Sequence, residues 1–346
     1  MITCPRCGGQ NRAGARFCRL CGFDLSSRQP SPPAGGPLTR LLRTVRHWVS
    51  GTDEARPAPG ATRRLAGERP SPPPSAPLPP PLLARPLRPA HGQATHPGRK
   101  RERNEDGVVT FTYDKEQADG AVPVGFFLVA DGMGGHEAGD VASRAVSQIV
   151  ADWIIKAQVL PDLRQATQRL NEGPLPAEML VHAIQQTNEV LRYHGQAGGS
   201  DLGSTVTAAL IVGDAATVAN VGDSRTYLLR NGRLEQITQD HSLVARLVAA
   251  GALTPAEART HPQRNRIYRG LGQQPTVEVD TFTVQLQRGD RLILCSDGLW
   301  EMVPDEEIRT IVQGARSPQK ACDALVEAAN RAGGEDNISV IVVEME

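Results

Sequence analysis

Four short acidic motifs lie in the C-terminal two-thirds of the chain: Asn104-Glu105-Asp106, Asp131-Gly132, Ser296-Asp297-Gly298 and Glu335-Asp336-Asn337. Asp131 and Asp297 each follow an apolar run and Asp336 precedes one, so these carboxylates are predicted to lie at strand ends. Carboxylates gathered in one cleft repel one another unless cations or protons neutralise them. Oxygen ligands of this kind favour hard ions such as Mg²⁺ or Mn²⁺ over zinc. Taken singly, an Asp-Gly pair is more often a turn.

Four of the six cysteines form a different kind of candidate site near the N-terminus. Cys4, Cys7, Cys18 and Cys21 have the spacing CxxC-x10-CxxC, and a glycine follows each pair. Each pair can point two thiolates at one tetrahedral ion, whereas a redox CxxC would not need two copies. The pattern predicts one structural Zn²⁺ in a small zinc ribbon. Cysteines clustered in this way are typical of a reducing compartment, so we expect a cytoplasmic protein.

The composition divides the chain into three segments. Residues 1–25 hold the predicted ribbon, residues 26–90 a Pro-rich linker, and residues 91–346 a globular domain. The interval from Pro30 to Pro97 contains 17 of the 27 prolines. Because too few apolar residues accompany these prolines to form a core, the linker is predicted to be disordered. The sequence shows neither a signal-peptide pattern nor an apolar run approaching 18 residues, so no membrane span is expected.

The zero net charge hides a difference between the two ends of the chain. Residues 1–95 hold 14 basic and 4 acidic residues; since the whole chain has 38 of each, the remainder holds 24 basic and 34 acidic. The acidic part suits divalent cations and argues against nucleic-acid binding there. The ribbon has several arginines but only Phe17 and Phe23 as aromatic platforms, so protein docking is favoured over nucleic-acid contact, with the partner unknown.

The globular part alternates long helical and short extended patterns. Residues 124–131 predict a buried strand, 136–158 and 177–194 predict helices, and 290–298 and 337–346 predict further strands. The first helix has an apolar stripe of Ala138, Val141, Ala142, Ala145, Ile149 and Trp153, and the second one of Leu180, Ala183, Ile184, Thr187, Val190 and Leu191.

The stretch 204–238 has a period of two and predicts four short strands. Turns are expected at Gly213-Asp214, Gly222-Asp223 and Asn231-Gly232, of which the last is typical of a type I′ hairpin. Short antiparallel strands together with two long helices indicate a layered α+β fold, with sheets packed together and helices outside.

Seven motifs in a fixed order give the sequence a resemblance to a known family. They are GRKRERNED (98–106), DGMGGHEAG (131–139), LGST (202–205), NVGDSR (220–225), HPQRNRIYRGLG (261–272), CSDGLW (295–300) and GGEDNISV (333–340). Over residues 96–346 the chain resembles the bacterial type 2C metal-dependent Ser/Thr protein phosphatases. The resemblance implies a four-layer α-β-β-α sandwich and a Ser/Thr phosphoprotein phosphatase.

The resemblance also implies roles for individual residues. Asp131 would bridge two metal ions, the carbonyl of Gly132 and the carboxylate of Glu105 would serve one of them, and Asp297 and Asp336 would bind the other.

Two further residues complete the implied two-metal centre, and two more fall at the positions of a third ion. Asp106 would orient metal-bound water, and the planar fork of Arg101 would hold phosphoryl oxygens. Two Mg²⁺ or Mn²⁺ ions sharing a water lower its pKa and present a bridging hydroxide to phosphorus. Asp223 and Glu301 fall at positions of a weaker third metal; family members often have Asp at the second position, so the longer Glu301 leaves that ion open.

The segment 241–272 resembles the family's flap beside the cleft. Its arginines Arg264, Arg266 and Arg269 are candidates for phosphopeptide recognition, with packing and capping as an equal alternative.

Three classes of function are compatible with these motifs. An active phosphatase would act on proteins phosphorylated on Ser or Thr, beside a cognate Ser/Thr kinase in signalling. A catalytically silent phosphoprotein-binding adaptor on the same fold is the alternative, which the presence of all four core carboxylates disfavours. A zinc-ribbon nucleic-acid regulator is the weakest hypothesis.

Overall fold

The computed structural model describes residues 2–3, 10–12, 86–117, 120–134, 137–160, 175–199 and 201–346. The chain forms two compact units, residues 1–78 and 79–346. In the first, strand β1 (Ile2–Thr3) pairs antiparallel with β2 (Gln10–Asn11). The four cysteines of the predicted zinc ribbon lie outside the described residues, as does most of the predicted linker.

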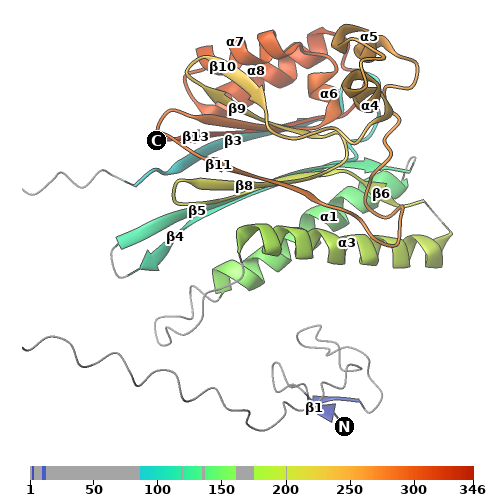
Figure 1. Cartoon of the computed structure of the whole chain (residues 1–346), viewed down its shortest axis with the longest axis vertical. Coiled ribbons are helices and arrows are strands. Elements are labelled where there is room, and N and C mark those ends of the chain that lie inside the picture. The colour runs from blue at the N-terminus through green and yellow to red at the C-terminus, as the bar shows by residue number, and fades with distance from the viewer. Residues whose placement is uncertain are drawn as a thin grey trace, which may run out of the picture. The chain divides into compact units, whose positions relative to one another are not determined.

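The second unit contains two antiparallel sheets (Figure 1). The six-stranded sheet has the order β11-β8-β7-β5-β4, with the short β6 paired to β5, and the five-stranded sheet has the order β10-β9-β12-β13-β3. The strands are β3 (Pro89–His96), β4 (Asp106–Gln117), β5 (Gly120–Met133), β6 (Gly203–Ser204), β7 (Val206–Val212), β8 (Ala215–Val221), β9 (Arg225–Arg230), β10 (Arg233–Gln236), β11 (Asp280–Gln285), β12 (Arg291–Cys295) and β13 (Ile338–Met345).

Helices cover the outer face of each sheet, which gives four layers (Figure 1). Helices α1 and α3 lie on the six-stranded sheet, and α7 and α8 on the five-stranded sheet, while α4 and α5 belong to the flap segment. The helices are α1 (Glu137–Ile154), its π-helical continuation η1 (Ile155–Val159), α3 (Pro176–Gly198), α4 (Leu243–Ala249), α5 (Pro255–Thr260), α6 (Asp297–Trp300), α7 (Asp305–Gly314) and α8 (Pro318–Arg331). The predicted α+β sandwich is confirmed.

Strand β5 shows why its sequence is apolar without alternation. Phe126, Leu128 and Ala130 pack under α1 and α3, whereas Phe127 and Val129 face the other sheet. Antiparallel strands usually alternate apolar and polar residues because one face meets water. Here both faces are covered, so every residue from 124 to 130 except glycine must be apolar.

The predicted stripes on the two long helices were wrong in detail. Val141 is 53% exposed and Val190 is 36% exposed. In α1 the fully buried line is Ala142, Val146 and Val150, because the centre of a wide apolar arc meets the sheet while its edge reaches water. The second helix extends beyond its predicted end to Gly198, and the left-handed Gly199 (φ 64°) ends it.

The predicted hairpin turn is confirmed. Asn231 and Gly232 both have positive φ, 51° and 78°, and they join β9 to β10 with Arg230 opposite Arg233. None of the described helices is both long and apolar enough to cross a membrane.

Candidate metal centre

One cavity gathers the acidic motifs at one end of the two sheets. It has a volume of about 250 Å³. Seven residues singled out by the sequence line it: Arg101, Glu105, Asp131, Gly132, Asp223, Asp297 and Asp336. Asp106 and Glu301 are not among its lining residues. Carboxylates separated by more than 200 positions in sequence therefore share one space.

The strand register brings the first two motifs together. Asp106, the first residue of β4, lies opposite Asp131 of β5. The amide of Gly132 donates to the carbonyl of Glu105 at 3.1 Å, which continues the pairing beyond the strand. A Cβ at Gly132 would collide with the carbonyl of Gly139, so the close approach of these two segments requires glycine there.

The later two motifs meet through the other sheet. Cys295, the last residue of β12, lies opposite Val340 of β13, so Asp297 just after one strand and Asp336 just before the other reach the same end. A Cβ at Gly298 would collide with the carbonyl of Asn337. The glycine of the SDG motif thus permits close packing of these two segments.

The side chain of Asn337, just before β13, forms hydrogen bonds with residues 97–105, the segment that contains Arg101. Its Oδ1 accepts from the amide of Glu105 at 2.8 Å, and its Nδ2 donates to the carbonyls of Pro97 and Arg103 at 3.0 and 2.8 Å. The side chain is buried, and all three bonds span more than 230 positions. The acidic sequence motif pointed to Asp336, and it gave no sign that its neighbour holds Glu105 in place.

A buried serine links Asp106 to the five-stranded sheet. The hydroxyl of Ser296 donates to Asp106 Oδ2 at 2.9 Å and accepts from the amide of Ser339 at 3.0 Å. Asp106 Oδ1 is buried and has no hydrogen-bond partner. A buried carboxylate oxygen without a donor is costly, which indicates that a water or an ion belongs beside it.

The electrostatics of the cavity are those of crowded carboxylates. Burial and the charges of neighbouring acids raise the pKa values of Asp131 and Asp297 well above the ordinary range. Burial is also the main cause that raises the pKa of Asp106 to about 6 and that of Asp223 to about 7. Without added positive charge, this site therefore disfavours the ionised forms of these four acids.

Arg101 supplies one positive charge at the cavity wall. Its Nη2 contacts Asp336 Oδ2 at 2.8 Å, while the side chain is 53% exposed. Burial alone would lower the pKa of Arg101, but the charges of Asp336, Glu105 and Asp297 outweigh it and raise the pKa. Much of the guanidinium remains open toward the cavity and solvent.

The donor set fits hard divalent cations. The described side chains that line the cavity offer carboxylate oxygens together with the hydroxyl of Thr205 and the amide oxygen of Asn265, and they include no His or Cys. Across the described ranges, no three or more His, Cys, Asp or Glu side chains are already arranged to hold an ion, and Asp336 is paired with Arg101 instead.

The two residues of the predicted third site have different surroundings. Asp223 lines the cavity, whereas the carboxylate of Glu301 contacts Arg264 Nε at 3.3 Å. The same guanidinium contacts Glu335 at 3.3 Å. Arg264 thus places a flap cation between the segments that carry Asp297 and Asp336.

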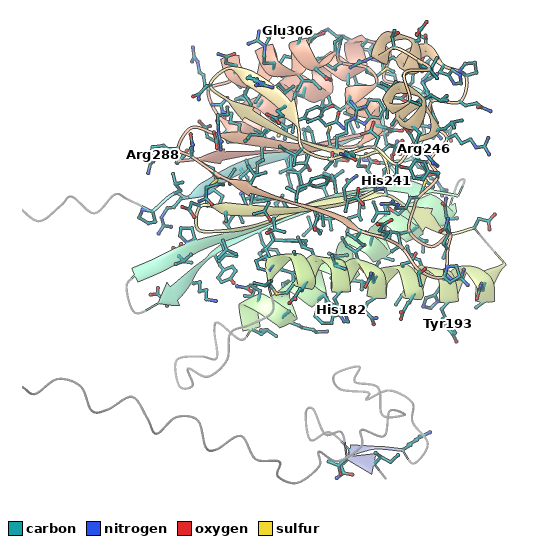
Figure 2. The ribbon with its side chains drawn as sticks, in the orientation of Figure 1. His182, Tyr193, His241, Arg246, Arg288 and Glu306 are labelled. Carbon is teal, nitrogen blue, oxygen red and sulfur yellow. The ribbon has the colours of Figure 1, made fainter. Side chains whose placement is uncertain are left out.

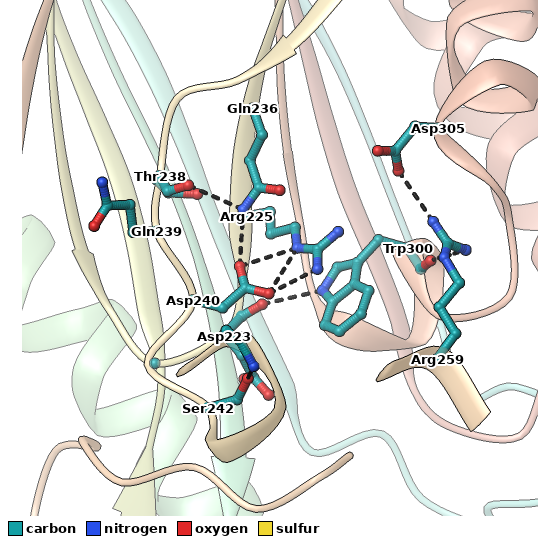
Figure 3. A network of polar contacts seen from close by, with 12 residues as sticks. Asp223, Arg225, Gln236, Thr238, Gln239, Asp240, Ser242, Arg259, Trp300 and Asp305 are labelled. Atoms are coloured by element: carbon teal, nitrogen blue, oxygen red, sulfur yellow. Dashed lines mark hydrogen bonds and ion pairs between the residues drawn. The ribbon is translucent and has the colours of Figure 1, made fainter. Parts of the chain in front are cut away.

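A buried network holds the backbone around Asp223 (Figure 3). Arg225 binds Asp240 through Nε and Nη2 and lies 3.6 Å from the ring centroid of Trp300. Trp300 Nε1 in turn donates to the carbonyl of Asp223 at 3.0 Å. The indole ring of Trp300 thereby fixes the position of the loop that contains Gly222-Asp223-Ser224-Arg225.

His241 fixes the same loop from the other side. The amide of Gly222 donates to His241 Nδ1 at 3.0 Å, so Nε2 carries the proton and donates to Asp280 at 3.1 Å. Burial lowers the pKa of His241, and Figure 2 shows the ring in the interior of the molecule. Arg269 pairs with Asp280 and Glu278. Arg264 and Arg269 thus form ion pairs within the chain, as the packing alternative predicts, and phosphopeptide recognition by the flap stays a prediction.

A family profile described as Protein phosphatase 2C matches residues 93–247 and 268–338. The serine/threonine phosphatase stp of Listeria welshimeri is 40% identical over 253 residues, which cover 72% of this chain and 93% of that protein.

Two solved structures are similar over the same region. A serine/threonine phosphatase of S. agalactiae has a TM-score of 0.63 and 34% identity, with 75% of this chain and 100% of that chain covered. The catalytic domain of the serine/threonine protein phosphatase PstP in complex with two manganese ions has a TM-score of 0.61 and 32% identity, with 75% and 98% covered.

Proposed function

This chain belongs to the protein phosphatase 2C family and is a metal-dependent Ser/Thr protein phosphatase, and we propose that the cavity around Asp131 is its catalytic centre. One observation carries the proposal: Glu105, Asp131, Asp297 and Asp336 line a single cavity together with Arg101. The direct test is release of phosphate from a phosphothreonine peptide, which should require Mn²⁺ or Mg²⁺ and should stop on chelation.

The proposed ligands divide between two cations. Asp131 would hold both, Glu105 and the carbonyl of Gly132 would hold one, and Asp297 and Asp336 would hold the other. When bound, the cations supply the positive charge that makes a water nucleophilic at neutral pH. Asp106 then orients water through Oδ1, which is buried and unpaired, while Ser296 holds Oδ2.

Arg101 is proposed to bind the phosphoryl group. With Asp336 as a cation ligand, the guanidinium of Arg101 would be free to contact phosphoryl oxygens in place of that carboxylate. The guanidinium then holds two equatorial oxygens and offsets charge as the Ser or Thr oxygen leaves.

Replacing Arg101 with alanine is expected to lower kcat/KM for a phosphothreonine peptide by about tenfold to a hundredfold, mostly through KM, since a bidentate charge-assisted contact is lost. Arg101→Lys should recover only part, because a point charge cannot span two oxygens. Steady-state kinetics would measure both. Arg99→Ala, a neighbouring arginine that does not line the cavity, is the matched control; an equal loss in that variant would contradict the assignment.

The proposed third ion has a competitor within the chain. Glu301 is already paired with Arg264, so an ion shared by Asp223 and Glu301 would have to displace a guanidinium. We therefore propose two catalytic cations, with a third only where the flap releases Arg264.

The N-terminal segment is proposed to be a zinc ribbon with a docking role, on the spacing of Cys4, Cys7, Cys18 and Cys21. We keep the boundaries 1–25, 26–90 and 91–346 as a proposal; the division into compact units falls at Leu78, and the sheet begins with β3. A cognate kinase and a cytoplasmic location also stay proposals, the latter resting on the cysteine pattern.

Removal of residues 1–85 is expected to leave hydrolysis of p-nitrophenyl phosphate within about twofold, because the cavity and all three clusters of buried apolar residues lie after residue 86. Metal analysis should find one Zn²⁺ per full chain and none after truncation. Cys4→Ser with Cys7→Ser should also lose zinc. Zinc retained by the truncated chain would refute the ribbon assignment.

A further inference from the structure

A second, larger cavity adjoins the proposed catalytic cavity. It has a volume of about 550 Å³ and shares Met133 and Gly134 with its neighbour. One wall is the C-terminal part of α3, and the segments 201–203 and 272–273 form the rest. A polypeptide leaving the catalytic cavity past Met133 would enter this space directly.

The walls of this cavity are held together by a buried asparagine. Asn188 Oδ1 accepts from the amide of Gly272 at 2.8 Å, and Asn188 Nδ2 donates to the carbonyl of Gln274 at 3.0 Å. Asn188 is 1% exposed, so both bonds are shielded from water. The end of the flap segment is thereby fixed to α3, and the cavity has a defined width.

Glycines keep the cavity open on both sides. Gly195 lies in the interior of α3, where glycine costs about 1 kcal/mol relative to alanine, and it is buried against the cavity. Gly203 and Gly272 form the opposite side. Backbone amides and carbonyls at such positions can approach another main chain closely, which suits an extended peptide.

Arg192 is the one cationic side chain among the described residues that line this cavity. It stands one helical turn after Asn188 and so lies on the same face of α3. It is half-buried, yet it pairs with no described residue, whereas Arg225, Arg264 and Arg269 nearer the flap all have acidic partners. The next residue, Tyr193, is 71% exposed at the outer surface of α3 (Figure 2).

We propose that this cavity binds the substrate polypeptide beside its phosphorylated residue, and that Arg192 receives an acidic side chain of that polypeptide. The proposal rests on the catalytic assignment of the neighbouring cavity. A half-buried guanidinium that has no partner among the described residues gains from a carboxylate, whereas Asp201 on the opposite side is exposed and stays hydrated.

The net negative charge of the domain should restrict the preference for an acidic residue to a single position of the peptide. Residues 96–346 carry ten more acidic than basic residues, so the domain as a whole repels acidic peptides. An aspartate should therefore help at the one peptide position that reaches Arg192 and be neutral or unfavourable elsewhere.

The test uses phosphothreonine peptides in which a single aspartate moves from four residues before to four residues after the phosphothreonine. With the full-length enzyme and Mn²⁺, one position is expected to raise kcat/KM about fivefold over the alanine peptide. Arg192→Ala should abolish this preference, and Arg192→Glu should replace it with a preference for lysine at the same position.

Two controls separate the possible failures. Hydrolysis of p-nitrophenyl phosphate, which carries no peptide, should be unchanged in both variants and shows that the fold and the catalytic centre are intact. Arg316→Glu makes the same charge change in the exposed turn between α7 and α8 and should keep the aspartate preference. An aspartate preference that survives Arg192→Glu, or no preference in the wild type, overturns the proposal; failure to hydrolyse any substrate overturns the catalytic assignment instead.

Discussion

Replacing Asp131 with asparagine is expected to lower kcat for a phosphothreonine peptide by at least about a thousandfold at saturating Mn²⁺. Asp131 is the carboxylate proposed to serve both cations, so its loss removes the charge that holds them together and the electrostatic stabilisation they provide. Phosphate release under single-turnover conditions would measure the chemical step directly. Calorimetric titration with Mn²⁺ should show weaker binding in the same variant.

The same substitution is expected to stabilise the metal-free protein. Burial and the charges of Asp297, Asp106, Asp223 and Asp336 raise the pKa of Asp131, which means that its ionised form is disfavoured in the fold. A neutral amide of the same shape removes that repulsion, so the melting temperature in EDTA should rise. Inactivity together with higher stability cannot be attributed to misfolding.

Asp214→Asn provides the matched control for both measurements. Asp214 is exposed in the turn between β7 and β8 and does not line the cavity. Its replacement should change neither kcat nor the melting temperature appreciably. Wild-type activity in Asp131→Asn would sink the catalytic assignment.

The sequence predicted the parts of the fold that depend on local pattern. The apolar run before Asp131, the period-two stretch from 204 to 238 and the Asn231-Gly232 turn each have their expected structure, since strand burial and positive φ act directly on residue type. The helix stripes were less accurate, because which edge of an apolar arc meets a sheet depends on the crossing geometry of the helix and not on its composition.

The sequence predicted the acidic residues of the centre better than the residues that position them. Asp131 and Asp336 stand out by type and context, whereas Asn337 and Ser296 are small polar residues whose roles arise from contacts across more than 180 positions. The pairing of Glu301 with Arg264 was equally invisible, because no local pattern shows which carboxylate a flap arginine will meet.

The crowded carboxylates are expected to make the metal-free enzyme less stable as pH rises from about 4 to 7, and Mn²⁺ is expected to reverse this trend. The folded state keeps protons that the unfolded chain has already released, since the pKa of Asp223 is raised to about 7 and those of Asp131 and Asp297 are raised well above the ordinary value. The free energy of unfolding therefore falls with pH, by a few kcal/mol in total. Cations bind only the ionised carboxylates, so with Mn²⁺ it should rise instead.

Two histidines have the opposite effect on the free energy of unfolding, which they make rise with pH below about pH 7. Burial lowers the pKa values of His91 and His241, and each such group adds stability as pH rises until the unfolded histidine has lost its proton, at about pH 7. Thermal unfolding from pH 4 to 8.5, in EDTA and in Mn²⁺, would record the sum of both effects. Subtracting the stability-against-pH curve of the wild type from that of Asp131→Asn isolates the contribution of Asp131, because both proteins contain the same histidines.

That difference should be small near pH 4, because Asp131 begins to ionise in the unfolded chain only there, and it should widen as pH rises further, because the fold raises the pKa of Asp131. The widening reports directly on a carboxylate that the fold keeps from ionising until a cation arrives. A gap between the two proteins that is constant across the range would mean that Asp131 ionises as freely in the fold as in the unfolded chain. The four carboxylates would then not be crowded enough to require the ions that the proposed chemistry uses.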